Sequence, residues 1–278
     1  MSLPSLSSPT DDSFFVLGKK VRLPSYLVVV IALMVLWELV CRIFQIPKWF
    51  LPPLSLVLRT FIEQYPLLLH HTWITLLEAM SGFGIAIVLS IALALLVDGS
   101  SFLRKILYPL MIISQTIPII TIAPLLVIWL GFGIGPKIVI VVLICFFPIS
   151  MSLIQSLSQV DQDYIALMKT MKANQHQIFF HLKIPSMLPS FFSGLKISAT
   201  YSIMGAVIAE WLGAKAGLGE YMRRTLHTFS TERVFCAILI IIGLSLLLVG
   251  VIRKLELLAL PWMYSTSKNR LSNKEVME

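Results

Sequence analysis

Few side chains in this sequence have the types and spacing that catalysis or metal binding requires. The sequence has no H-E-x-x-H, G-x-S-x-G or G-x-x-x-x-G-K-[ST] segment, the patterns of zinc proteases, serine hydrolases and phosphate-binding loops. His70 and His71 are adjacent and cannot share one helix face, and His176 and His181 are five residues apart, a poor spacing for two ligands of one metal ion. We therefore predict no catalytic residue, no metal site and no bound cofactor.

Polar side chains occur inside long apolar runs, where they could contact a transported solute. An ionisable residue at membrane depth is by default a functional candidate. Glu78 could contact solute or pair with a basic neighbour, whereas Glu210 lies near the end of its run, where its charge could be partly solvated. Hydroxyl and amide groups could line a water-filled path or bond to neighbouring helices. The candidates for a translocation path are Glu78, Ser114, Gln115, Thr116, Tyr201, Ser202 and Glu210.

The apolar runs themselves indicate the fold class. Of the 278 residues, 57% are hydrophobic and 13% are charged, against about 25% charged in soluble proteins. A helix that crosses the hydrocarbon core of a bilayer needs about 20 apolar residues. We predict an all-α integral membrane protein with six transmembrane helices, at about 25–44, 70–97, 106–130, 136–156, 191–212 and 233–258.

The formal charge of +8 could suggest a nucleic-acid partner, but Lys and Arg are scattered at the ends of the apolar runs. Their distribution favours a cytoplasmic N-terminus, because basic residues near helix ends are retained in the cytoplasm. Six spans then place both termini on that side. We predict a cytoplasmic tail over 1–24, a first span with an outer interfacial segment over 25–69, a core over 70–258 and a cytoplasmic tail over 259–278.

Prolines mark irregular places in this plan. The segment after the first span contains Pro47, Pro52 and Pro53, and we expect it to lie at the outer interface with a short helix near Leu54 to Gln64. Pro118 and Pro124 fall inside the third run, 106–130, and should bend that helix.

A polar, basic segment of about thirty residues, 160–189, separates the fourth and fifth spans. Asp161 or Asp163 can cap a first short helix, and Asn174 with Gln177 forms a capping-box pattern for a second, which should stop before Pro185. The segment could be a connector or a docking surface. Two capped amphipathic turns favour docking, with Ile165, Met168 and Met171 on one side.

This segment resembles the cytoplasmic coupling loop of permease subunits of bacterial binding-protein-dependent ABC importers. That loop has the pattern E-A-A, three residues, G, nine residues, I-x-L-P. Leu182, Lys183, Ile184 and Pro185 occupy the I-x-L-P positions, whereas Ala166, Leu167 and Met168 replace E-A-A and Lys172 replaces the glycine. The stretches SQTIPIITIAPLLVIWLGFGIGPK and GLKISATYSIMGAVIAEWLGAKAGLGEYM are similar to spans of the nitrate, sulfonate, taurine and thiamine-precursor subgroup.

The resemblance implies a non-catalytic subunit in the bacterial cytoplasmic membrane, with ATP bound by a separate ATPase dimer. Its other partners would be an external solute-binding protein and a second permease copy. Because lysine disfavours the left-handed conformation that glycine adopts freely, Asn174 could take over the role of the lost glycine. The implied ATPase contacts are Asp163, Ile165, Ala166, Met168, Lys169, Met171, Lys172, Ala173 and Pro185.

The sequence around ALMKTMKAN and KISATYSIMGAVIAEWLGA is most similar to permeases for hydroxymethylpyrimidine-type thiamine precursors or riboflavin. Sulfonate, taurine or nitrate remains an alternative solute class. An ion-coupled secondary transporter would predict an internal repeat and paired charges at the midplane, and neither is evident. An intramembrane enzyme would need a nucleophile or metal constellation at depth.

Overall fold

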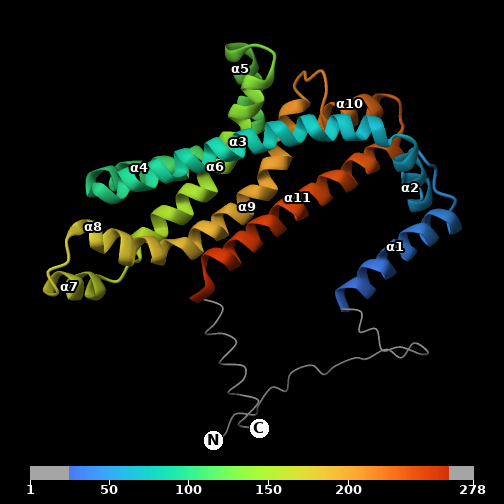
Figure 1. Cartoon of the computed structure of the whole chain (residues 1–278). Helices are drawn as coiled ribbons and strands as arrows, with labels where there is room; N and C mark the ends of the chain where they lie inside the picture. The colour runs from blue at the N-terminus through green and yellow to red at the C-terminus, as the bar shows by residue number, and fades with distance from the viewer. Residues whose placement is uncertain (1–24, 263–278) are drawn as a thin grey trace, which may run out of the picture.

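The computed structural model describes residues 25–262, and the regular secondary structure of this part of the chain is entirely helical (Figure 1). The tail predicted over 1–24 lies outside the described residues, as does the tail predicted over 259–278 from residue 263 onward. The helices are α1 Ser25–Ile43, α2 Leu54–Glu63, α3 Tyr65–Gly99, α4 Ser101–Ser114, α5 Ile119–Leu130, α6 Ile134–Ser158, α7 Gln162–Thr170, α8 Gln175–Ile178, a π-helical turn Phe179–Lys183, α9 Ile184–Glu210, α10 Leu218–His227 and α11 Thr231–Ala259.

The core of the bundle is α6, which packs against α3 on one side and α9 on another, with α11 beside α9 (Figure 1). Small residues allow these close approaches, as expected for helices that pack in a membrane. A Cβ added to Gly82 of α3 would lie 2.5 Å from Val141 of α6, and one added to Gly194 of α9 would lie 2.9 Å from Ser152. The three helices therefore form one tightly packed unit.

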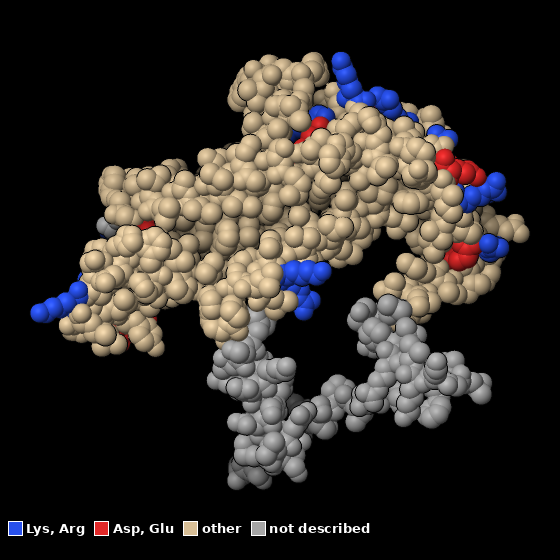
Figure 2. Space-filling model, in the orientation of Figure 1, with Lys and Arg blue, Asp and Glu red and all other residues tan. Residues whose placement is uncertain are grey.

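Four continuous stretches are long and apolar enough to cross a membrane, namely 65–99, 134–158, 175–210 and 231–259 within the described residues. A bent pair, Phe102–Ser114 and Ile119–Leu130, could count as a fifth span. Figure 2 shows the charged side chains mainly near the two ends of the long helices, with a broad uncharged band between them. The predicted first span corresponds to α1, which has 19 residues and packs chiefly against α2, so six spans stay a prediction.

The bend predicted inside the span 106–130 is present, and it interrupts the helix. The structure has two helices there, and they meet at an angle of 96°. Pro118 lacks an N–H, adopts an extended conformation (ψ 122°) and forms the N-cap of α5, so the helix cannot continue through it. Pro124, in contrast, lies inside α5 without ending it.

The predicted stop before Pro185 is also wrong, because α8, the π-helical turn and α9 follow one another without a break. Proline in a helix clashes with the carbonyl one turn earlier. Pro185 lies in the first turn of α9, directly after the wider π-helical turn Phe179–Lys183. The wider turn accommodates the proline ring, and the second short helix is continuous with the fifth span.

The short helix predicted near Leu54 to Gln64 is confirmed as α2, Leu54–Glu63. It lies at the same end of the bundle as α10, opposite α7 and α8 (Figure 1). The structure therefore has one end formed by α2 and α10, called the α10 end below, and one formed by α7 and α8, called the coupling end.

Candidate functional site

The first short helix of the coupling end is α7, and its start and end are both defined by side-chain or backbone geometry. The Asp161 carboxylate accepts a hydrogen bond from the Asp163 N–H at 2.9 Å, so Asp161 is the cap. The helix ends at Thr170 with Met171 as its C-cap, and Lys172 directly after the cap has a φ of 58° in the left-handed region. Asn174 has a φ of −78°, so the expectation that Asn174 replaces the missing glycine is wrong. Lys172 itself takes that conformation.

The second short helix begins with the predicted capping box. The Asn174 side chain accepts from the Gln177 N–H and the Gln177 side chain accepts from the Asn174 N–H, both at 2.8 Å. These two bonds satisfy backbone donors that the helix start would otherwise leave unpaired.

The side chains of α7 fall into two groups by exposure. Ile165 and Met168 are partly buried against the rest of the chain, whereas Met171 is 75% exposed. Sequence reasoning missed Tyr164 and Leu167, which are exposed by 59% and 57%. Their spacing with Met171 puts all three on one helix face, and this spacing was readable in the sequence. We call Tyr164, Leu167 and Met171 the α7 apolar face.

The remaining residues predicted to contact the ATPase surround this face or follow it. Asp163, Ala166, Lys169 and Lys172 are exposed, and Ala173 and Pro185 are partly buried.

At the α10 end, polar side chains from three long helices form a buried cluster. Lys137 of α6 donates to Glu78 of α3 at 2.6 Å, and Glu78 is 2% exposed. Of the two alternatives for Glu78, the structure shows the basic neighbour. Glu210 of α9 is fully buried, so its predicted partial solvation is wrong. Its carboxylate accepts from Thr75 Oγ1 and from the Gly219 N–H, each at 2.6 Å.

This cluster holds the start of α10. Three consecutive N–H groups, those of Gly217, Leu218 and Gly219, donate to His71 Nδ1, Thr75 Oγ1 and Glu210 Oε2 at 2.9, 2.8 and 2.6 Å. Gly217 has a φ of 125°, and a Cβ there would collide with the Glu210 carboxylate. The loop before α10 therefore fits closely over Glu210. Sequence reasoning missed His71 and Thr75 because their partners lie 135 to 146 residues away.

The other candidates for a translocation path differ in accessibility. Ser114 and Thr116 lie at the bend between α4 and α5, and their hydroxyls donate to the carbonyls of Met111 and Ile113. Gln115 between them is exposed. Ser202 is buried and donates to the Ala199 carbonyl, whereas Tyr201 is 41% exposed. Gln115 and Tyr201 are thus the accessible polar candidates at membrane depth that do not use their side chains to satisfy a nearby carbonyl or a charge.

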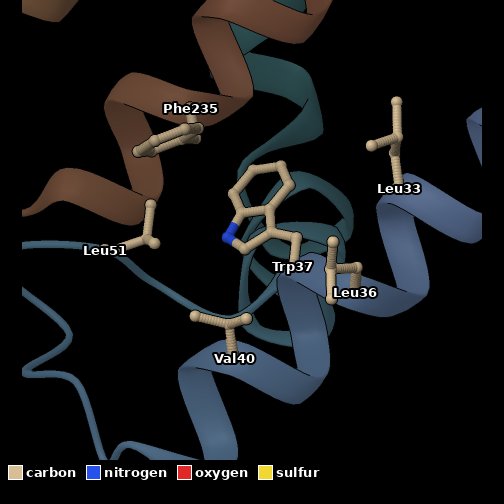
Figure 3. A pocket seen from close by; sticks show the side chains of 6 residues that line it. All are labelled: Leu33, Leu36, Trp37, Val40, Leu51 and Phe235. Atoms are coloured by element: carbon tan, nitrogen blue, oxygen red, sulfur yellow. The ribbon is translucent and has the colours of Figure 1, made fainter.

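An apolar crevice of about 400 Å³ lies between α1 and the start of α11 (Figure 3). Figure 3 shows the Trp37 indole between Phe235 and Val40, and the two aromatic rings are 5.2 Å apart. The Trp37 Nε1 is buried without a partner. This crevice offers almost no polar group, which does not suit a polar solute. The lining residues are Leu33, Leu36, Trp37, Val40, Leu51 and Phe235.

Three comparisons with known proteins bear on this arrangement. Residues 86–257 match the family described as binding-protein-dependent transport system inner membrane component. The formylaminopyrimidine transport permease protein ThiX of Halalkalibacterium halodurans is 39% identical over 83% of this chain and 92% of its own length. The riboflavin transport system permease protein RibX of Chloroflexus aurantiacus is 28% identical over 84% of this chain and 88% of its own.

A solved structure shares the fold. The match to an inward-facing structure of the MetNI methionine ABC transporter has a TM-score of 0.56 and covers 69% of this chain and 97% of that one, at 16% identity. Family membership also favours an ATP-driven importer over an ion-coupled secondary transporter. The chain belongs to the binding-protein-dependent transport system inner membrane component family and is a multi-pass permease subunit of an ABC importer.

Proposed function

We propose that this permease moves a formylaminopyrimidine-type thiamine precursor into the cell, delivered by an external binding protein and driven by a separate ATPase dimer. The observation that carries the solute class is the similarity to ThiX, which extends over 83% of the chain at 39% identity. A relative named for riboflavin transport is less similar, at 28%, and it shares with the first a planar heteroaromatic solute.

The exposed surface of α7 at the coupling end supports the proposal that a separate ATPase binds there. Three apolar side chains are exposed side by side on a short helix that projects from the bundle, with polar and basic neighbours around them (Figure 1). Exposed apolar side chains rimmed by polar ones are typical of protein-binding sites. ATP hydrolysis then belongs to the partner, and the permease supplies no catalytic residue.

The bent pair α4 and α5 supports a second permease copy. In Figure 1, α5 stands away from the bundle, and its side chains Ile128 and Trp129 are 74% and 70% exposed. Two identical copies, each with six spans and cytoplasmic termini, would cover these faces and enclose a path between them. Gln115 and Tyr201 are the polar side chains that we propose to meet solute in that path.

The experiment is uptake into proteoliposomes that contain the permease, its ATPase and ATP, with the binding protein outside. We expect uptake of labelled formylaminopyrimidine that requires ATP and survives collapse of ion gradients. Excess unlabelled riboflavin, taurine or nitrate serves as competitor. Uptake blocked by taurine or nitrate would contradict the solute class, and uptake without ATPase would contradict the mechanism.

A further inference from the structure

A bidentate ion pair, in which one ammonium group bonds to both oxygens of a carboxylate, joins the coupling end to the junction of α3 and α4. Lys183 Nζ donates to both Oδ1 and Oδ2 of Asp98 at 2.8 Å, across 85 residues of sequence. The side chains are only 21% and 12% exposed, so solvent screens their attraction less than it screens a surface pair. Arg104 of α4 approaches the same carboxylate, at 3.9 Å.

The positions of these residues determine what the pair connects. Lys183 is the last residue of the π-helical turn and is continuous with both α8 and α9. Asp98 lies in the last turn of α3, two residues before Ser100, whose hydroxyl caps α4 by accepting from the Leu103 N–H at 3.4 Å. The pair therefore connects the coupling end to the first turn of the bent pair α4 and α5.

In the described part of the chain, few contacts other than those with α3 could transmit a movement of the coupling end to α4. The helix α4 packs chiefly against α3, and it leads directly into the bend at 115–118. Among the ion pairs of residues 25–262, Lys183–Asp98 is the one that reaches from the 175–183 segment to another helix. The pair therefore gives a displacement of α8 a direct polar connection to the junction of α3 and α4.

We infer that Lys183 and Asp98 are positioning residues for energy coupling, and that they make the α4–α5 pair follow the coupling end when the ATPase moves it. The inference rests on the proposed function, because it needs an ATPase bound to α7. The element with two arrangements is the bend between α4 and α5, and the ion pair biases it from the coupling end. Neither residue touches solute or nucleotide in this role.

The test measures the accessibility of a residue at the bend between α4 and α5 rather than transport, so it does not depend on the solute. Gln115 is exposed at the bend and all three native cysteines are buried, so Q115C gives one accessible thiol. The labelling rate of this thiol by a maleimide is measured in the full permease–ATPase complex, with and without ATP and orthovanadate. Four backgrounds are compared, namely unmutated, Lys183→Met, Lys183→Arg and Lys196→Met.

The matched control is Lys196, whose Nζ makes a similar bidentate pair with Oε1 and Oε2 of Glu256 at 3.0 and 2.8 Å. That pair joins α9 to α11 and does not reach α4. We expect nucleotide to change the Q115C labelling rate by about tenfold in the unmutated, Lys183→Arg and Lys196→Met backgrounds. In Lys183→Met the change should fall below about twofold while the ATPase still copurifies.

A full nucleotide response in Lys183→Met would overturn the inference. Loss of the response in Lys183→Arg would also overturn it, because arginine keeps the charge and can bond to both carboxylate oxygens. Loss of the response in Lys196→Met would overturn it as well, because it would indicate general destabilisation. If the unmutated complex itself gives no nucleotide response, or the ATPase does not copurify with it, the proposed function fails and the inference fails with it.

Discussion

At the scale of single residues, Lys172 adopts a backbone conformation that its side chain opposes. Its φ of 58° costs a residue with a Cβ about 1 kcal/mol relative to glycine. We predict that Lys172→Gly stabilises α7 by up to about 1 kcal/mol, after allowing for the greater freedom of glycine in the unfolded chain. Hydrogen exchange of the α7 amides measures this, because slower exchange reports a more stable helix.

The control for this prediction is Lys169→Gly, the same substitution inside α7, where the backbone is helical. Glycine in a helix interior costs about 1 kcal/mol, so exchange of the same amides should become faster. Equal effects at both positions would show that the lysine side chains, rather than the backbone at position 172, determine the result.

Glu220 is a second residue whose environment predicts a measurable effect. Its side chain is 1% exposed and accepts from Arg223 at 2.7 and 2.8 Å and from Arg224 at 2.6 Å. Burial raises the pKa of Glu220, but the two guanidinium groups outweigh burial, so its pKa lies below the usual value. Because the folded pKa is depressed, the carboxylate stabilises the fold above its unfolded pKa, and this is lost as the pH falls through the folded value.

We therefore predict that Glu220→Gln lowers the stability of the detergent-solubilised protein by about 1 to 2 kcal/mol near neutral pH. The difference from the unmutated protein should shrink as the pH falls below about 4. Thermal unfolding at a series of pH values measures both effects. The control is Glu63→Gln, whose exposed pair with Arg59 should change stability by less than about 0.5 kcal/mol. A constant difference at all pH values would exclude the carboxylate as its cause.

At the scale of helices, the α7 apolar face makes the docking proposal specific. We predict that Leu167→Asp reduces copurification of the ATPase by about tenfold or more, because it puts a charge into a desolvated contact. Its control is Gln162→Asp, which adds the same charge to α7 on the opposite, exposed face. Normal copurification of Leu167→Asp, or equal loss with Gln162→Asp, would contradict the assignment of this face.

Helices were predictable where local signals determine them. The Asn174 capping box and the short helix before Gln64 depend on residues within a few positions of each other, and both were predicted correctly. The burial of Glu210 depends on Thr75 and on the loop before α10, and the continuation through Pro185 depends on a π-helical turn. Neither the burial of Glu210 nor the continuous helix at Pro185 leaves a pattern in the nearby sequence. Periodicity and capping rules therefore could not reveal these two features.

At the scale of the whole molecule, the two ends of the bundle have distinct roles in the proposal, so they must face opposite compartments. Lys169 is exposed on α7 and Lys215 is exposed just before α10, and Figure 1 shows these two helices at opposite ends of the bundle. The native cysteines are buried. Lys169→Cys and Lys215→Cys therefore report the two ends separately. Neither substitution removes a described side-chain contact.

We predict that a membrane-impermeant maleimide added to intact cells labels Lys215→Cys and leaves Lys169→Cys unlabelled. In cells that produce the permease without its ATPase, opening the membrane with detergent should then expose Lys169→Cys, because a maleimide reacts with an accessible thiolate and the bilayer alone protects it there. The excess of Lys and Arg in the predicted cytoplasmic tails and loops of the sequence is the physical reason, since basic flanks are retained inside. Labelling of Lys169→Cys in intact cells would put α7 outside, where no ATP-hydrolysing partner could bind it, and the proposed mechanism would then be wrong.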